Sequence, residues 1–429
     1  MIRVPVADLR SCTGQTVTVA GWVHALRLQR AMQFVLVRDH TGMVQLTHRR
    51  DGTALEAELE GLTVESAVRV TGRVAGNPVV SLGGLEIIPE RVTVENWAAT
   101  PLPIDDNTGP EGRLDWRFLD VRRHPAARLV FAVQTTAEQA MREFAYASGC
   151  TEMHTPKLMG SASESGAEVF ELGYFGSSAY LAQSPQFYKQ MAIAAGVDRV
   201  FEIGPVFRAE PSFTSRHATE FTGVDVELAW ISDVEDVMDF EERMLAHTLA
   251  AVDGAHGEQI AEFFGTRVTV PKVPFPRITM ARAHEMLGTA GTRADLDPAG
   301  ERAISARMTE LTGHEFVFVT GYPASVRPFY HMRPAGQPDL TCSFDLLWKG
   351  LEITTGAQRE HRYDVLVRQA AEKGLSAASM RYYLDCFRYG CPPHGGLGLG
   401  LGRLLMALLG LDSIREATFL FRGPNRLTP

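Results

Sequence analysis

Short segments of alternating apolar and polar residues dominate the first hundred positions of the chain. Strand side chains alternate between two faces, so this pattern predicts β-strands. The predicted strands lie at 16–22, 33–38, 42–47, 67–74 and 85–88, with an amphipathic helix near 54–62. Short strands separated by glycine and asparagine turns are typical of a small closed barrel of the OB type. We therefore expect an OB-type β-barrel over residues 1–100.

Phe34 and Gln45, on two adjacent predicted strands of this barrel, are candidates for contacts with a nucleic-acid base. OB-type barrels bind single-stranded nucleic acid by stacking bases on exposed aromatic rings. The alternative is that Phe34 belongs to the barrel core, and the pattern alone favours that alternative.

The composition changes at residues 99–112, where prolines, glycines and polar turn formers gather in the sequence ATPLPIDDNTGPEG. Such a stretch is typical of a linker, so we expect a hinge over 101–127 and a second domain over 128–429. Apolar residues at helical spacing predict helices there, while shorter apolar runs predict strands. The predicted helices are 129–146, 185–195, 233–252 and 357–373, and the predicted strands are 316–321 and 341–355.

The stretch 201–230 contains two apolar runs that flank a long polar loop. Its alternation predicts two antiparallel strands. Arg208 and Glu210 are two positions apart, so they lie on the same face of the first strand. The loop adds Arg216 and His217, and arginine donors suit phosphate oxygens. Each single pair is more often a surface ion pair, but the full set indicates a polyphosphate site built on a hairpin.

Residues 394–411 form a glycine-rich run, HGGLGLGLGRLLMALLGL, that ends in an apolar segment carrying Arg403. The glycines allow either close approach of a flat ligand to the backbone or tight helix packing, and the sequence favours neither. The spacing does not match the dinucleotide-binding fingerprint. A phosphate-binding P-loop is also excluded, because no Gly-Lys pair occurs in the chain.

Asp345 and Glu352 are acids that flank an apolar strand segment, and Arg359 follows a turn of small residues. Two carboxylates of this kind suit Mg²⁺ shared with substrate phosphates, although buried structural acids are a common alternative. Arg359 is suited to bind a carboxylate through two parallel hydrogen bonds. The histidines show no metal-ligand spacing.

Composition restricts the class of protein further. The chain has 429 residues, 45% hydrophobic and 22% charged, and a net charge of −9, which excludes a broadly basic nucleic-acid coat but not a local basic groove. Its five cysteines are irregularly spaced, which indicates no disulfide framework and no zinc site. We find no signal peptide and no apolar run of membrane-spanning length, so we expect a cytoplasmic protein without a membrane partner.

Three stretches resemble, in order, the three signature motifs of the class II aminoacyl-tRNA synthetases. The segment ending at Pro156 resembles motif 1, Arg208-Ala209-Glu210 with its loop resembles motif 2, and the glycine run with Arg403 resembles motif 3. The N-terminal barrel is similar to that of the subgroup charging aspartate, asparagine and lysine. The resemblance covers essentially the whole chain. It implies an α+β protein, with a catalytic domain on an antiparallel sheet with flanking helices, and a homodimer formed through motif 1.

Within this subgroup, residues 183–189 (QSPQFYK) resemble an element of the aspartate-specific members. By that resemblance, Lys189 and Arg359 bind the side-chain carboxylate of the amino acid. The positions implied for its α-amino end are Glu164, Gln186 and Asp225. In asparagine-specific relatives the lysine position usually holds another residue, so Lys189 is the main discriminator between the two substrates.

The resemblance also implies the ATP contacts and the catalytic residues, which are Arg208, Glu210 and Arg403. Arg208 would contact the α-phosphate, and Glu210 the adenine amine or the tRNA end. Arg216 and His217 would reach the β- and γ-phosphates. Phe221 and Arg403 would enclose the adenine, and Asp345 and Glu352 would bind Mg²⁺.

For the tRNA, the resemblance implies that Phe34 is a ring on which a base stacks, and not a core residue, and that Phe34 and Gln45 contact the anticodon. Relatives that are strict for tRNA(Asp) resemble one another in carrying a tryptophan and a lysine where this chain has His24 and Pro78. The compact length resembles the archaeal and eukaryotic form. These features favour a non-discriminating enzyme that charges tRNA(Asp) and tRNA(Asn) and leaves aspartyl-tRNA(Asn) to an amidotransferase.

The implied reaction activates L-aspartate with ATP to aspartyl-adenylate and transfers it to the tRNA 3′ end. Three alternatives remain. An asparaginyl-tRNA synthetase is opposed by Lys189. A non-charging paralogue that acts as a binding module is opposed by the retained Arg208, Glu210, Glu352, Arg359 and Arg403. An amide ligase on the same fold would not need residues 1–100.

Overall fold

The computed structural model describes residues 3–161, 168–292 and 294–429. By its internal contacts the chain divides into two units, Met1–Asn107 and Thr108–Pro429. Each unit has its own hydrophobic core and is described by itself.

The first unit is a closed five-stranded barrel in the order β1-β2-β3-β5-β4, which confirms the expected OB-type domain. Val19, Val35 and Val70 on alternate strand positions fill its interior, because successive strand side chains point to opposite faces. The elements are η1 (Val6–Cys12), β1 (Thr16–Leu28), β2 (Met32–Arg38), β3 (Met43–Arg49), α1 (Ala54–Gly61), β4 (Ala67–Gly76) and β5 (Leu85–Asn96).

Residues 101–127 were expected to form a hinge. In the structure most of this stretch is helical, and it belongs to the second unit from Thr108 onward. Helix α2 (Pro110–Asp115) begins with a proline at its first turn, followed by α3 (Arg117–Arg123). Proline is favoured at this position because the N–H groups of the first helical turn have no acceptor within the helix, so a residue without an N–H loses no hydrogen bond there. Leu114 and Leu119 are buried, and this apolar pattern was hidden among the polar turn formers.

An eight-stranded sheet forms the centre of the second unit, in the order β12-β13-β14-β15-β16-β11-β10-β6. All its neighbours are antiparallel except β12/β13 and β10/β6. The bounds are β6 (Thr151–Glu152), β10 (Arg199–Phe207), β11 (Glu220–Ala229), β12 (Arg277–Thr279), β13 (Phe316–Thr320), β14 (Ser343–Trp348), β15 (Leu351–Arg359) and β16 (His394–Gly400).

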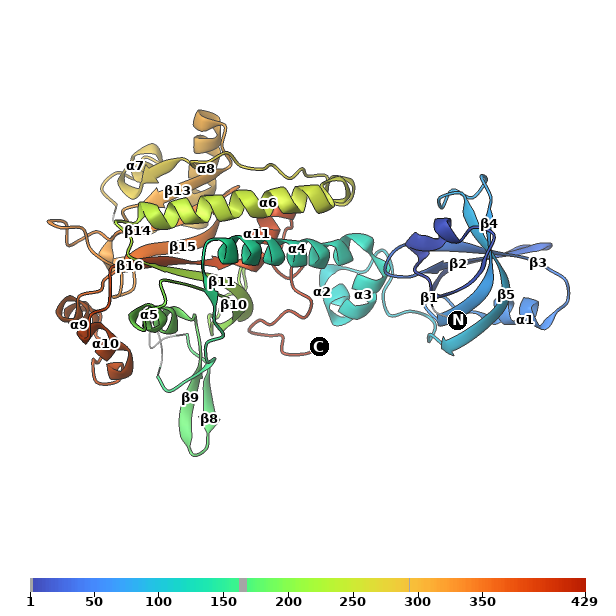
Figure 1. The fold of residues 1–429 in the computed structure, drawn as a ribbon, viewed down its shortest axis with the longest axis horizontal. Helices are drawn as coiled ribbons and strands as arrows, with labels where there is room; N and C mark the ends of the chain where they lie inside the picture. The colour runs from blue at the N-terminus through green and yellow to red at the C-terminus, as the bar shows by residue number, and fades with distance from the viewer. Residues whose placement is uncertain (1–2, 162–167, 293) are drawn as a thin grey trace. The chain divides into compact units, whose positions relative to one another are not determined.

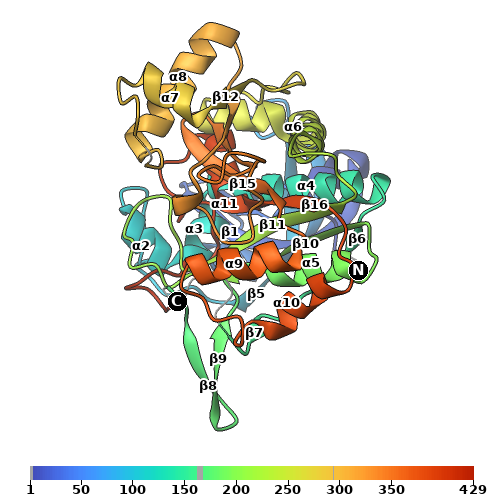
Figure 2. The ribbon, with the colours of Figure 1, turned by 90° about the vertical axis from the view of Figure 1, so that its left-hand side faces the viewer.

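Two long helices, α4 (Pro125–Ala147) and α6 (Glu235–Phe264), lie side by side along one face of this sheet (Figure 1). The largest apolar core lies between them and the sheet. Helix α6 extends twelve residues beyond the predicted end at 252, since its C-cap is Gly265. A second core joins α5 (Gln186–Ala194), α9 (Tyr363–Glu372) and α10 (Arg381–Arg388), which gather on another side of the sheet (Figure 2).

The remaining elements complete the second unit. Strands β8 (Glu171–Tyr174) and β9 (Ser177–Leu181) form a hairpin that projects from the body in both views (Figures 1 and 2), and β7 (Leu158–Met159) pairs with β9. The others are α7 (Met280–Met286), α8 (Pro298–Thr312), η2 (Ala324–Val326) and α11 (Leu401–Leu409). Within the described ranges, no helix is both long and apolar enough to cross a membrane.

The helix predicted over 357–373 is wrong at its start, because β15 continues to Arg359 and α9 begins only at Tyr363. Residues 357–359 pair with β14 on one side and β16 on the other. Hydrogen bonding on both edges overrides the local helical pattern. The segment predicted as one strand over 341–355 is the hairpin of β14 and β15, which turns at Lys349 and Gly350 with positive φ at both, as a tight hairpin requires.

Candidate active site

A cavity of about 350 Å³ opens above the centre of the large sheet. Its walls come from the β10–β11 hairpin, β15, β16, the start of α11 and the 327–331 segment. The structure therefore brings together side chains that are far apart in the sequence. The predicted residues that line the cavity are Gln186, Arg208, Glu210, Arg216, His217, Phe221, Asp225, Glu352, Arg359 and Arg403.

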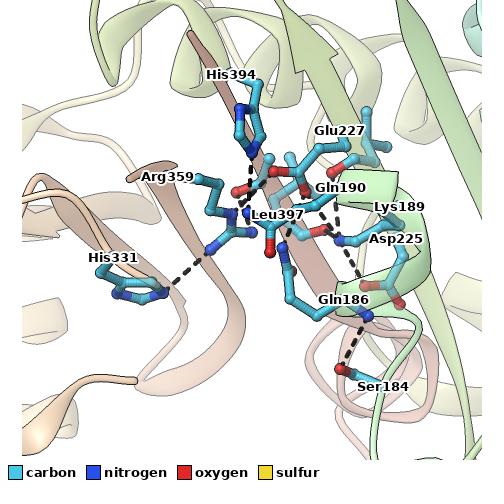
Figure 3. A network of polar contacts seen from close by, with 12 residues as sticks. Ser184, Gln186, Lys189, Gln190, Asp225, Glu227, His331, Arg359, His394 and Leu397 are labelled. Atoms are coloured by element: carbon cyan, nitrogen blue, oxygen red, sulfur yellow. Dashed lines mark hydrogen bonds and ion pairs between the residues drawn. The ribbon is translucent and has the colours of Figure 1, made fainter. Parts of the chain in front are cut away.

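Glu227, which the sequence analysis missed, is the centre of a buried polar network beneath this cavity (Figure 3). Its Oε1 accepts a hydrogen bond from Arg359 Nε at 3.0 Å, and its Oε2 lies 3.4 Å from Lys189 Nζ. Gln186 Nε2 donates to Oε2 at 3.4 Å. Burial alone would raise the carboxyl pKa, but Arg359 and Lys189 hold the pKa of Glu227 below its usual value.

Lys189 is only 1% exposed and is absent from the cavity wall, although the sequence analysis assigned it to direct substrate contact. Its Nζ donates to Asp225 Oδ1 at 2.9 Å and to the Leu397 carbonyl at 3.0 Å. Lys189 is therefore connected to the cavity only through Asp225, whose side chain does line it. Glu164, the other residue assigned to the amino end, lies outside the described residues.

Arg359 reaches the cavity wall from the end of β15. Besides Glu227, it contacts the Gly396 carbonyl through Nη2 at 3.0 Å and His331 Nε2 through Nη1 at 3.1 Å. His331 also lines the cavity and was missed by the sequence analysis, which found only its lack of metal-ligand spacing. Burial and the neighbouring Arg359 lower the pKa of His331 well below its usual value, so the ring is neutral and accepts from the guanidinium.

The glycine run forms β16 and the start of α11, so its glycines serve the sheet and not only helix packing. A Cβ added at Gly396 would lie 2.1 Å from the Val226 carbonyl oxygen and 2.3 Å from Glu227 Oε2. The missing side chain is what leaves space for the buried carboxylate. The same strand presents the Gly396 and Leu397 carbonyls to Arg359 and Lys189.

The opposite part of the cavity carries looser contacts between charged side chains. Arg208 and Glu210 are 3.9 Å apart, and the Arg208 side chain is 41% exposed. The Arg208 guanidinium lies 5.4 Å from the centre of the Phe221 ring, on the neighbouring strand. These side chains keep most of their donors and one aromatic face available to a ligand.

Three further side chains in this part come from the hairpin loop and from α11. Arg216 Nη1 donates to Glu301 Oε2 at 2.7 Å, and Arg403 Nη1 donates to the Glu352 carbonyl at 3.0 Å. His217 differs from its expected cationic role. Burial, with Arg403, Arg216 and Arg208 nearby, lowers its pKa below the usual value despite Glu210.

The two acids assigned to Mg²⁺ lie on neighbouring strands, with Glu352 at the cavity and Asp345 behind it. Burial, and next the charge of Asp345, raise the pKa of Glu352 to about 7. Such mutual repulsion between two acids on paired strands fits a cation between them. Among the described residues no cluster of three or more metal-ligating side chains occurs.

On the barrel, Phe34 is half-buried and faces outward, whereas its neighbour Val35 fills the core. Gln45 lies on the paired strand β3, and its Nε2 donates to Thr47 Oγ1 at 3.0 Å. The outward ring agrees with a base platform and not with the core position that the pattern alone favoured.

The two positions assigned to tRNA choice lie in this same unit. His24 sits at a bulge of β1, and its Nδ1 is 2.7 Å from Arg38 Nη1. Pro78 lies in the β4–β5 loop beside Asn77, whose amide donates to Glu86 Oε1 at 3.0 Å. Because Thr47 donates to the same carboxylate at 2.5 Å, the loop of Pro78 is connected to Gln45.

The chain is similar to known proteins over nearly its full length. Residues 109–422 match the family model described as tRNA synthetases class II (D, K and N), and residues 17–95 match the OB-fold nucleic acid binding domain. An aspartate–tRNA(Asp) ligase of Thermococcus kodakarensis is 42% identical, covering 97% of both chains. An aspartate–tRNA(Asp/Asn) ligase of Methanopyrus kandleri is 44% identical, covering 97% of this chain and 96% of its own.

Solved structures agree with this assignment. The asparaginyl-tRNA synthetase of Pyrococcus horikoshii complexed with asparaginyl-adenylate has a TM-score of 0.92 and 34% identity, with both chains fully covered. The aspartyl tRNA synthetase of Entamoeba histolytica has a TM-score of 0.88 and 29% identity, covering 100% of this chain and 93% of that one. With a barrel, three motif-bearing segments and a charged cavity in place, the chain belongs to the class II tRNA synthetases of the D, K and N group and is an aminoacyl-tRNA ligase.

Proposed function

We propose that this ligase activates L-aspartate with ATP and transfers it to tRNA(Asp) and also to tRNA(Asn). The observation that carries the choice of amino acid is Arg359, which lines the cavity, with Lys189 buried behind it on the shared carboxylate of Glu227. A substrate carboxylate gains from a fixed guanidinium, whereas a neutral amide gains little. Asp225, at the same end of the cavity, provides the acceptor for the substrate ammonium.

Activation is a displacement at the α-phosphate of ATP, with the aspartate α-carboxylate as the nucleophile. The new C–O–P bond forms as the bond to pyrophosphate breaks, and the tRNA 3′-hydroxyl then attacks the mixed anhydride and releases AMP. Arg208 stabilises charge on the α-phosphate, and Phe221 and Arg403 hold the adenine. Catalysis is therefore positioning and electrostatic stabilisation, without a covalent enzyme nucleophile.

Asp345 and Glu352 are the residues that would hold Mg²⁺, and the ion would neutralise phosphate charge during the displacement. The remaining cations of the cavity come from the chain itself. Arg216 lies at the hairpin loop, where it is placed for the distal phosphates, with His217 beside it as a neutral donor.

The test is ATP–pyrophosphate exchange with aspartate and asparagine in parallel. We expect exchange with aspartate alone. Exchange with asparagine would overturn the substrate assignment and support an asparaginyl-tRNA synthetase, whose solved relatives share this fold. Absence of exchange with both amino acids, with tRNA present, would instead support a non-charging paralogue.

The tRNA range rests on the barrel, since full-length relatives of both kinds are about equally similar to this chain. His24 and Pro78 stand where relatives strict for tRNA(Asp) resemble one another in carrying tryptophan and lysine. A histidine bonded to Arg38 and a proline in the β4–β5 loop provide neither a large ring nor a cation. Weaker selection at the third anticodon base is the expected consequence.

Charging assays on pure tRNA(Asp) and tRNA(Asn) test this range, and a preference of several hundred-fold for tRNA(Asp) would contradict it. His24→Trp combined with Pro78→Lys is expected to increase the preference for tRNA(Asp). A product aspartyl-tRNA(Asn) needs a tRNA-dependent amidotransferase to become asparaginyl-tRNA. We also propose that the enzyme is a homodimer and acts in the cytoplasm, where translation uses its product.

A further inference from the structure

Arg327, which no motif of the sequence analysis includes, lies between the cavity and the carboxylate of Asp345. The arginine lines the cavity, whereas Asp345 is 3% exposed and does not. Arg327 Nη2 donates to Asp345 Oδ2 at 2.5 Å. The approach to this acid from the cavity is therefore covered by a cation of the chain itself.

The position of Arg327 is fixed from a second side. Its guanidinium carbon lies 3.7 Å from the centre of the Tyr322 ring, a stacked arrangement that suits the planar group. The Tyr322 ring is itself buried, at 1% exposed. The arginine donates to one oxygen of Asp345, Oδ2, and the Tyr322 hydroxyl is a second hydrogen-bonding neighbour of this carboxylate.

We propose that Arg327 is a positioning residue that substitutes for the divalent cation at Asp345 until nucleotide brings that cation in. This inference rests on the proposed function, since it concerns the same ATP site. In the nucleotide-free enzyme Arg327 satisfies Asp345 and keeps free Mg²⁺ out. When nucleotide and metal bind, the Arg327 guanidinium would leave Asp345 and pair with the nucleotide phosphates instead.

Charge balance explains why such an arrangement is useful. Asp345 and Glu352 lie on paired strands, and without a counter-charge they would repel the ATP polyphosphate. Arg327 balances Asp345, and Arg403 lies 3.5 Å from the Glu352 carboxylate. The nucleotide therefore meets a cavity in which these two acids already face arginines, and Arg327 would release Asp345 to a divalent cation that accompanies the phosphates.

Direct binding of Mn²⁺ to the nucleotide-free protein, followed by the electron paramagnetic resonance signal of free Mn²⁺, tests the proposal without measuring activity. Arg327→Gln is expected to bind Mn²⁺ about tenfold more tightly than the wild type, because a competing positive charge has been removed. Adding Asp345→Asn to this variant should return the affinity to the wild-type value. Aspartate-dependent exchange by the wild type tests the proposed function separately.

Arg327→Lys keeps a positive charge beside Asp345. This variant should therefore stay folded even if the unpaired Asp345 of Arg327→Gln destabilises the protein. It loses the stacked fork, so a smaller rise in Mn²⁺ affinity is expected. Arg333→Gln is the matched control. Arg333 pairs with Glu372 at 2.6 Å, and neither residue lines the cavity, so the loss of this arginine should leave Mn²⁺ binding unchanged. Equal or weaker Mn²⁺ binding by both Arg327 variants, including no detectable binding in any protein, would overturn the proposal.

Discussion

The proposed amino-acid end and the proposed nucleotide end of the cavity both contain arginine–carboxylate pairs, but the geometry of these pairs differs. At the amino-acid end, Glu227 and Lys189 are at most 1% exposed, and their contacts join several strands and a helix. At the nucleotide end, Arg208 and Glu210 are 3.9 Å apart and partly exposed. A closed network fixes one geometry, whereas the loose Arg208–Glu210 pair can change partners when phosphates arrive. The Arg327–Asp345 pair at the same end is close and buried, so it would open only when a bound cation replaces the charge of the arginine.

The difference matches the two tasks. Distinguishing a carboxylate from an amide needs buried cations that cannot relax toward the wrong ligand. Binding ATP, releasing pyrophosphate and admitting a tRNA end need side chains that change partners during each cycle. The following predictions test whether the two ends respond differently to the loss of one charge.

The largest expected effect comes from Glu227→Gln, which leaves Lys189 and Arg359 without their shared carboxylate. Removing one partner of a buried ion pair costs about 3–5 kcal/mol of folding free energy, measurable by urea denaturation. Glu210→Gln, at the looser end, is the matched control and should cost less than about 1 kcal/mol. Equal losses for the two variants would remove the distinction between the two ends.

Arg208→Ala should abolish activity and leave stability nearly unchanged, in contrast to Glu227→Gln, which should lower stability. Loss of a cation that stabilises the transition state lowers rates by about 10²–10³-fold or more, so pyrophosphate exchange should become undetectable in a routine assay. The melting temperature should stay close to that of the wild type, because the side chain is 41% exposed. Normal exchange in this variant would refute the role assigned to Arg208.

Glu241 on α6 sharpens the comparison, because it is an acid buried without a cation. No arginine, lysine or histidine pairs with its carboxylate among the ion pairs of the described residues, and its hydrogen-bonding neighbour is the neutral hydroxyl of Thr354. Burial raises its pKa from 4.5 to about 8. The folded protein keeps a proton that the unfolded chain releases, so the free energy of unfolding should fall as pH rises through this window, by up to roughly 1.4 kcal/mol per pH unit.

Glu241→Gln should therefore flatten the pH dependence of unfolding between those two values, as measured by denaturant titrations at several pH values. Glu242→Gln is the control from the next position. Its carboxylate pairs with Arg277 at 2.8 Å, so the variant loses stability but should keep the slope. An unchanged slope in Glu241→Gln would show that another group binds the proton.

The smallest effect is expected for Glu301→Gln, which releases Arg216 from its 2.7 Å contact. If this pair must open for the ATP phosphates, its loss should lower the KM for ATP by a few-fold, because Arg216 no longer has to leave a largely buried carboxylate. The kcat of exchange should change little. A higher KM for ATP would show instead that Glu301 holds Arg216 in its productive position.

The sequence predicted the parts of this molecule whose pattern is local. The barrel, the hairpin whose loop carries Arg208 and the long helix over 129–146 follow from alternation, turn residues and helical spacing. The start of α9 was misplaced, because pairing of 357–359 with two neighbouring strands is invisible in a local window.

The site was predictable only in part for the same reason. Arg208 and Glu210 were found together through strand alternation, although β10 ends at Phe207 and both residues lie in the loop that follows it. Glu227 stands two positions after Asp225 and faces the same way, a signal that was available but was attributed to strand alternation. Arg327 had no such signal, since its partner Asp345 and its stacking ring Tyr322 meet it only in the folded chain.

Strand β16 has a consequence for the biosynthesis of the enzyme itself. It is the last strand of the large sheet to be translated among the described residues, yet it lies between β11 and β15 in the sheet order. Until β16 emerges from the ribosome, the earlier strands form two separate groups, and Arg359 and Lys189 lack the Gly396 and Leu397 carbonyls. The proposed amino-acid pocket is thus completed only when one of the last segments of the chain has been made.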